Sequence, residues 1–133
     1  MKRIRSLVAV FIAVLCLSGI TIVFAESFNF YIPEYGAASS SYYWKEMNVS
    51  KANVIVTSVT VQGAITNFLI AQTGNGTQLT EAFEIGAGSG HIFTYAYNGN
   101  NYSMPRINVA LRGNYTATGW GYSVSGNWYP NWP

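Results

Sequence analysis

The pattern of apolar residues changes near residue 25. Residues 7–24 are almost continuously apolar, and they follow a short basic head over residues 1–5. A basic head, an apolar run and a small residue such as Ala25 before polar residues are typical of a secretory signal peptide. We therefore predict a helical signal peptide over residues 1–25, cleaved near Ala25. An uncleaved membrane anchor is the alternative, because the apolar run is about long enough to cross a bilayer.

Beyond residue 26, apolar and polar residues alternate in short runs that are rich in β-branched and aromatic side chains. Clusters of glycine and asparagine at 73–77, 86–90 and 98–101 separate several of these runs. Alternation with a period of two between turn clusters is typical of antiparallel β-strands. The pattern predicts seven or eight strands, over residues 27–32, 40–46, 53–62, 64–72, 79–85, 91–97, 106–112 and 119–125.

A single sheet of this length would expose a large apolar face, whereas two packed sheets bury it. We therefore predict an all-β fold, an antiparallel β-sandwich formed by one domain over residues 26–133. A small closed barrel is the second choice. The clearest strand, 106–112, is expected to point Ile107, Val109 and Leu111 inward and both of its arginines outward.

Other strands give less regular patterns. The strand over 53–62 has one face of Ile55, Thr57, Val59 and Val61 and another with Val54 and Val56, so it is a candidate for burial on both sides. Residues 40–46 place Tyr42 and Trp44 on one face, opposite Tyr43 and Lys45. In the last predicted strand, Trp120 and Tyr122 are expected in the core.

Charge and cysteine content exclude several functions once residues 1–25 are removed. The remaining chain has four lysines and arginines against five glutamates, a net charge of −1, and its cations are scattered. Nucleic-acid binding and polybasic membrane attachment both need clustered cations, so neither is expected. The single cysteine, Cys16, lies in the predicted leader, so packing must stabilise the domain without disulfides.

Residues that support catalysis are scarce. The chain after residue 25 has no aspartate, and its one histidine is His91. Glu81 or Glu84 would have to replace the acid of a catalytic triad, and one histidine without cysteines is a poor zinc site. We expect His91 to be a strand-end residue and the glutamates to be solvated. The sequence therefore predicts no enzyme and no catalytic, cofactor or metal site.

Aromatic residues are the remaining signal for binding. A cluster around Trp44 and another in the C-terminal tail indicate a candidate binding surface of Trp44, Trp128, Tyr129 and Trp132. Prolines in the tail argue against a central strand there. The tail is expected either to fold back over an open end of the sandwich or to stay exposed for a partner.

The segments 109–112 and 122–131, which run from an aliphatic strand to Ser125-Gly126-Asn127-Trp128-Tyr129-Pro130, resemble the C-terminal ending of an uncharacterised family of small secreted Bacillales proteins. The leader and the early Phe28 and Phe30 also fit that family. In general character the chain is more distantly similar to lactococcin-972-type bacteriocins. The first resemblance implies a Gram-positive origin, and neither implies a site.

Three functions follow as expectations. The first is a secreted, non-enzymatic protein that binds a glycan or protein partner at the cell envelope or in the extracellular matrix. The second is a carbohydrate-binding module that uses the C-terminal aromatics. The third is an exported bacteriocin or membrane-active toxin in which alternating strands such as 91–97 line a barrel. In the first two, the protein meets a membrane only during export.

Overall fold

The computed structural model describes residues 24–116 and 119–133. Every strand pair in this part of the chain is antiparallel, and no residue in it is helical. The predicted all-β fold is therefore confirmed. The predicted signal peptide lies outside the described residues except for its last two positions. Within the described residues there is no helix of the length and apolarity that crossing a membrane requires.

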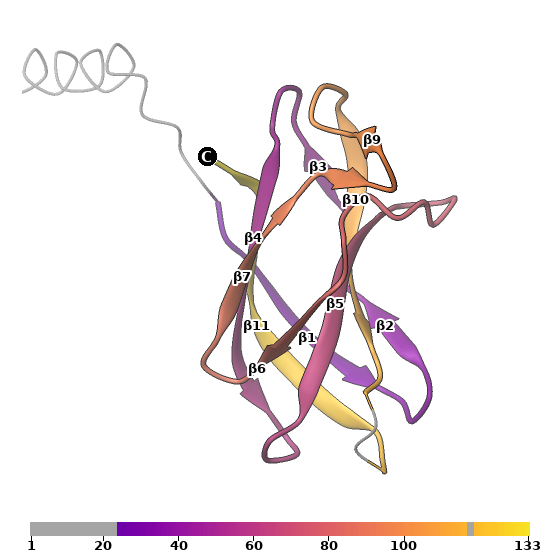
Figure 1. Ribbon diagram of the computed structural model, residues 1–133. Helices are drawn as coiled ribbons and strands as arrows, with labels where there is room; N and C mark the ends of the chain where they lie inside the picture. The colour runs from indigo at the N-terminus through magenta and orange to yellow at the C-terminus, as the bar shows by residue number, and fades with distance from the viewer. Residues whose placement is uncertain (1–23, 117–118) are drawn as a thin grey trace, which may run out of the picture.

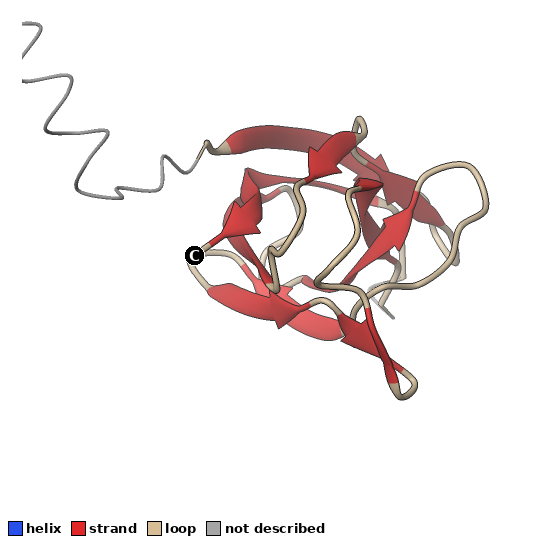
Figure 2. Cartoon of the chain, turned by 90° about the horizontal axis from the view of Figure 1, so that it is seen from above, coloured by secondary structure: helices blue, strands red, loops and turns tan. Residues whose placement is uncertain are grey.

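The strands form two facing sheets and one small hairpin (Figures 1 and 2). The first sheet has the order β1 (Glu26–Ile32), β11 (Tyr122–Trp132), β4 (Lys51–Val59) and β7 (Gly90–Thr94). The second has the order β2 (Ala37–Ser39), β10 (Ile107–Asn114), β5 (Ile65–Gln72) and β6 (Phe83–Gly86), and β3 (Tyr43–Lys45) also pairs with β10. The hairpin consists of β8 (Ala96–Tyr97) and β9 (Asn100–Asn101).

These are eleven strands, whereas seven or eight were predicted. The additional ones, β2, β8 and β9, are two or three residues long, which is too short for alternation to appear in the sequence. Some predicted strands are also shorter than expected. The strand over 40–46 becomes the three-residue β3, β6 begins only at Phe83, and β7 ends at Thr94.

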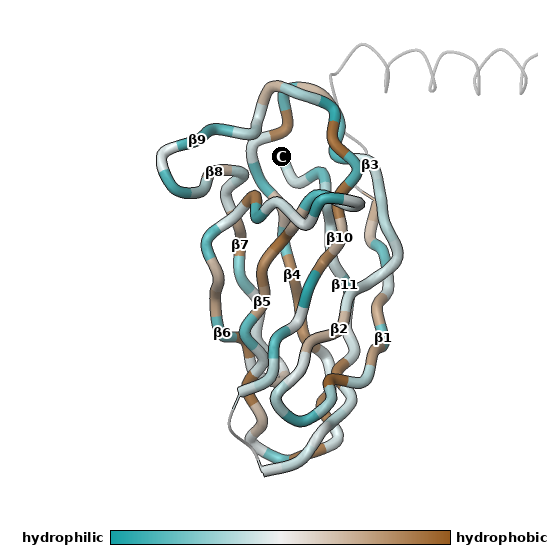
Figure 3. The backbone as a smooth tube through the Cα atoms, turned by 90° about the vertical axis from the view of Figure 1, so that its right-hand side faces the viewer, coloured by the Kyte–Doolittle hydropathy of each residue, from teal (hydrophilic) through white to brown (hydrophobic). Residues whose placement is uncertain are grey.

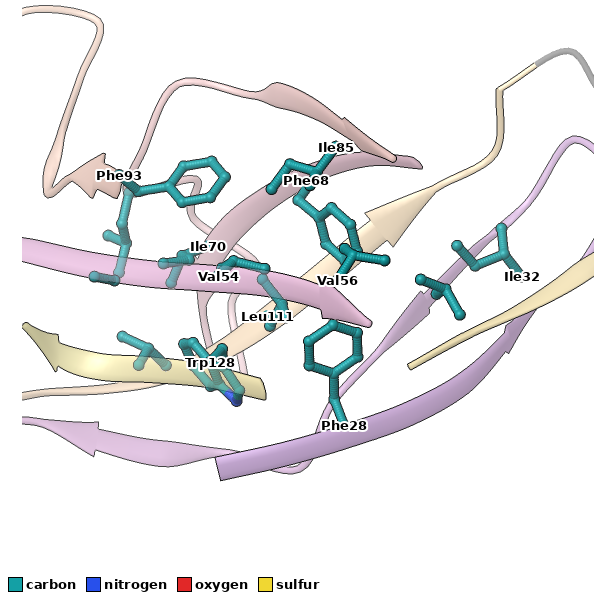
Figure 4. Close-up of a cluster of buried hydrophobic side chains, with 14 of the residues drawn as sticks. Phe28, Ile32, Val54, Val56, Phe68, Ile70, Ile85, Phe93, Leu111 and Trp128 are labelled. Atoms are coloured by element: carbon teal, nitrogen blue, oxygen red, sulfur yellow. The ribbon is translucent and has the colours of Figure 1, made fainter. Parts of the chain in front are cut away.

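The core lies between the two sheets and draws side chains from both (Figure 4). Figure 3 shows hydrophobic positions recurring along β4, β5 and β10, which lie inside the sheets. The predicted orientation of 106–112 is confirmed, since Ile107, Val109 and Leu111 are buried and both arginines are exposed. These inward positions join the core cluster that includes Val54 and Trp128 of the facing sheet.

The strand over 53–62 does not have two buried faces. Ala52, Val54 and Val56 are buried, whereas Ile55 points outward. The register with β11 shifts between Val56, which pairs with Gly126, and Ser58, which pairs with Ser125. One extra residue in β4 at this bulge reverses the alternation. Val59 and Val61, further along the chain, therefore pack against the same core as Val54.

Two predictions for the end of the chain are wrong. Trp120 is 65% exposed, because β11 begins only at Tyr122, which is buried as predicted. The tail does belong to a central strand, since β11 runs through Pro130 to Trp132. Proline is tolerated here because β1 pairs no further than Trp128, and the register with β4 shifts between Tyr129 and Trp132. The missing N–H therefore falls at an interruption of the ladder.

Candidate functional site

Trp128, one of the predicted surface aromatics, is a core residue. It lies on the inward face of β11, is fully buried, and meets the ring of Tyr43 edge-on at a centroid distance of 5.7 Å (Figure 4). Its indole Nε1 is buried without a hydrogen-bond partner. Trp128 is therefore removed from the candidate binding surface, because alternation along β11 sends it to the same side as Tyr122 and Val124.

Tyr129 and Trp132 lie on the outer side of the first sheet and are half-buried. Their rings meet edge-to-face, with centroids 5.1 Å apart and planes at 68°. Asn53 and Lys51 of β4 are their partners in the register. The two rings pack on each other and do not form a coplanar platform.

Trp44 is the exposed tryptophan of the predicted surface, with 44% of its area accessible. The guanidinium of Arg106 lies 4.0 Å from its ring centroid, and Arg106 Nε donates to Glu46 Oε2 at 3.1 Å. Asn131 of the C-terminal tail also contacts the segment that contains Trp44 and Glu46. Asn131 Nδ2 donates to the carbonyl of Trp44 at 2.9 Å, and the N–H of Glu46 donates to Asn131 Oδ1 at 2.7 Å.

A groove of about 440 Å³ lies beside Trp44, where β1 begins and β11 ends. We call it the Trp44 groove. It combines an exposed indole with two carboxylates, an amide and apolar walls. Its lining residues are Phe24, Glu26, Tyr43, Trp44, Glu46, Val49, Pro130 and Asn131.

Lys45 supports the strand that carries Trp44. Its side chain is buried, and Nζ donates to the carbonyl oxygens of Glu46 at 2.9 Å and of Ser103 and Pro105 at 2.8 Å each. Nζ also lies 5.3 Å from the ring centroid of Tyr95. Burial lowers the pKa of Lys45, and the charge of Glu46 acts in the opposite direction. The ammonium group thus joins β3 to the loop before β10.

Tyr43 and Glu26 interact on the inner side of the groove. Burial raises the pKa of Tyr43, and the neighbouring carboxylate of Glu26 raises it further. Phenolate formation beside a carboxylate is unfavourable, so Tyr43 stays a neutral hydroxyl. Sequence reasoning missed Glu26, Glu46 and Asn131 as site residues, because they come from three separate strands or turns and share no motif.

A second groove, of about 640 Å³, runs along β7 and includes Glu81, His91 and the loop of the β8–β9 hairpin. The imidazole of His91 stacks on Phe83 with centroids 3.6 Å apart and meets the edge of Phe93 at 4.8 Å. Among the described residues no hydrogen bond joins His91 to a carboxylate, as a triad would require. The described residues also contain no group of three or more potential metal ligands of the His, Cys, Asp and Glu types.

The stacking of His91 leads to a testable pH dependence. Burial lowers the pKa of His91, because an imidazolium would lose hydration between Phe83 and Phe93. The unfolded chain therefore takes up this proton at a higher pH than the folded chain, and stability falls as pH decreases below about 6.5. We expect urea midpoints of the wild type to decrease between about pH 7 and about pH 5, and His91→Phe to reduce that decrease. Equal pH slopes for both proteins would contradict this.

No protein-family model matches the chain, and no curated protein matches it significantly. Among solved structures, the chain is similar to the crystal structure of a mitogen derived from Yersinia pseudotuberculosis. That similarity has 10% sequence identity and a TM-score of 0.43, and it covers 78% of this chain and 85% of the mitogen.

Proposed function

We propose that the protein is a secreted, non-enzymatic binding protein that attaches to a glycan of the cell envelope or extracellular matrix through the Trp44 groove. The observation that supports this is the exposed indole of Trp44 beside Glu26, Glu46 and Asn131. An aromatic ring offers an apolar face to the C–H groups of a sugar ring. Carboxylate and amide groups around it accept and donate hydrogen bonds with hydroxyls.

The charged residues of the Trp44 groove limit which classes of glycan can bind. Glu26 and Glu46 are its two charged lining residues, and Arg106 pairs with Glu46. Polymers of neutral sugars or N-acetylated amino sugars suit this arrangement, whereas polyanions such as teichoic acids would meet the carboxylate of Glu26. We therefore propose peptidoglycan or a related amino-sugar polysaccharide as the ligand.

The groove is held in place before any ligand arrives. Asn131 fixes the backbone of Trp44 and Glu46 with two hydrogen bonds, and Lys45 fixes the same strand from inside with three. A site built on hydrogen-bonded strands loses little conformational entropy on binding. Cleavage of the predicted signal peptide near Ala25 would remove Phe24 and leave the other seven lining residues of the Trp44 groove on the exported domain.

Binding of the purified protein to insoluble peptidoglycan, measured by sedimentation, tests the proposal. We expect Trp44→Ala to weaken binding at least about tenfold, as the loss of a central aromatic contact does. Its thermal midpoint should stay close to that of the wild type, because the ring is exposed. Trp44→Phe should retain part of the affinity, since it keeps an aromatic face.

Trp120→Ala is the matched control, because it also removes an exposed indole but lies outside the groove. It should bind like the wild type. Equal binding by Trp44→Ala and the wild type would exclude the groove as the site. Loss of binding in both variants would indicate nonspecific adhesion through exposed aromatics.

The bacteriocin alternative has no comparable feature in its favour. Phe93 and Tyr95, from the segment expected to line a barrel, are buried, and the Tyr95 hydroxyl donates to the carbonyl of Pro130 at 2.7 Å. That segment would have to leave the core to reach a membrane. Dye release from liposomes at micromolar protein would nevertheless favour the toxin over the glycan-binding protein.

A further inference from the structure

The strand β7 has a free edge. It is the last strand of the first sheet and pairs only with β4. The N–H of Tyr95 donates to the carbonyl of Ser50, and the register pairs Lys51 with Thr94. Hydrogen-bonded and non-bonded pairs alternate in an antiparallel ladder. The N–H and C=O groups of Gly90, Ile92 and Thr94 therefore point away from the sheet; we call this the β7 edge.

The β7 edge lacks the features that usually prevent strands from pairing with other chains. Its five residues, Gly-His-Ile-Phe-Thr, include no lysine, proline or acidic residue, and the register with β4 has no bulge. Gly90 and Thr94 are exposed, and Ile92 is 48% exposed. An edge of this kind is a template for another strand.

We propose that the β7 edge pairs antiparallel with the β7 edge of a second copy, about a two-fold axis through Ile92. Gly90 of each copy then lies opposite Thr94 of the other, and Ile92 lies opposite its counterpart. The three pairs exchange about six backbone hydrogen bonds. The two four-stranded sheets become one continuous sheet, in the self-complementary arrangement of a two-fold dimer.

Side chains on both faces of β7 suit a second copy. On the outer face, Ile92 lies next to Asn53 and close to the partly exposed Ile55, so their apolar surface would continue across the axis. On the inner face, His91 would lie opposite Phe93 of the other copy. The stacked Phe83, which is 45% exposed, would then become covered.

Few charged side chains surround β7. Figure 3 shows β7 and β6 on the same side of the molecule, below the β8–β9 hairpin. The groove along β7 contains one acidic side chain, Glu81, so pairing buries little charge. Five residues form a small interface, and we expect a dimer that dissociates at micromolar concentrations.

Sedimentation equilibrium of the purified protein over a wide concentration range tests the dimer. We expect the wild type to change from monomer to dimer, and Ile92→Lys to remain a monomer because two ammonium groups would meet at the axis. Ile65→Lys is the matched control, since Ile65 is an isoleucine of similar exposure, 44%, on the other sheet. It should dimerise like the wild type. A monomeric wild type at several hundred micromolar, or a dimeric Ile92→Lys, would overturn the proposal.

Cross-linking gives a second measurement that does not depend on Ile92→Lys folding. The chain after residue 25 has no cysteine, so Ile92→Cys places one thiol at the proposed axis. Opposed residues in a hydrogen-bonded pair have Cα atoms about 5.5 Å apart, which suits a disulfide. Oxidation should therefore convert Ile92→Cys to a covalent dimer much faster than Ile65→Cys. Equal rates would contradict the two-fold pairing.

Discussion

Trp128→Ala is expected to destabilise the protein by about 3–5 kcal/mol, the usual cost of replacing a buried tryptophan with alanine. The indole is fully buried between the sheets and packs edge-on against Tyr43. Its removal leaves a cavity that two hydrogen-bonded sheets cannot close. Equilibrium unfolding in urea, followed by circular dichroism, measures the change.

Trp44→Ala is the comparison that distinguishes a loss of folding stability from a loss of ligand binding. Both tryptophans belong to the surface predicted from the sequence, but only Trp44 is exposed. We expect Trp44→Ala to leave the urea midpoint nearly unchanged and Trp128→Ala to lower it strongly. If Trp128→Ala has wild-type stability but impaired peptidoglycan binding, Trp128 belongs to the binding surface. That result would contradict its buried position.

The difference between the two tryptophans shows where alternation is informative. In β10 the inward set could be predicted, because the strand is regular, lies inside its sheet and has polar residues on the outward side. In the tail, the same alternation continues from Val124 to Trp128, but Pro130 obscured it. The proline rule did not apply, because β1 ends its pairing at Trp128 and a register shift accommodates the missing N–H.

The bulge in β4 had no detectable sequence signal. Its extra residue reverses the side-chain pattern between Val56 and Ser58, so two faces predicted from strict alternation merge into one. At Gly126, the residue opposite, an added Cβ would lie 2.0 Å from the carbonyl oxygen of Ile55. Only the paired strand reveals why glycine is needed there, and sequence patterns within one strand do not contain that information.

The candidate site was predictable only in part. Alternation places Trp44 on the face of β3 opposite to Tyr43 and Lys45, but it does not say which of the two faces is exposed. The burial of Lys45 itself does not follow, because lysine is normally solvated and its three acceptors include carbonyls 58 and 60 residues away. Asn131 likewise reaches Trp44 across 87 residues. Contacts at such separations depend on how the sheets pack and leave no local pattern.

Val109→Asp is expected to prevent folding of the domain. Val109 is fully buried at the centre of the second sheet, where it pairs with both Tyr43 of β3 and Gln72 of β5. Burial of valine contributes about 1.5–3 kcal/mol, and an aspartate at this position would add an unpaired charge without hydration. The combined loss approaches the entire stability of a domain of this size, about 5–15 kcal/mol. Circular dichroism and thermal melts of the purified variant measure it.

Ala110→Asp introduces the same side chain one residue further along β10, on the outward face beside Arg112. There the carboxylate reaches water, so the variant should fold with a loss of about 1 kcal/mol or less. Arg106→Ala should also fold, because its ion pair with Glu46 is exposed and such pairs contribute about 0–1 kcal/mol. If Ala110→Asp fails to fold while Val109→Asp remains as stable as the wild type, β10 has the opposite register. The inward face would then carry Arg106 and Arg112, and the β3–β10 contact that presents Trp44 would have to be reassigned as well.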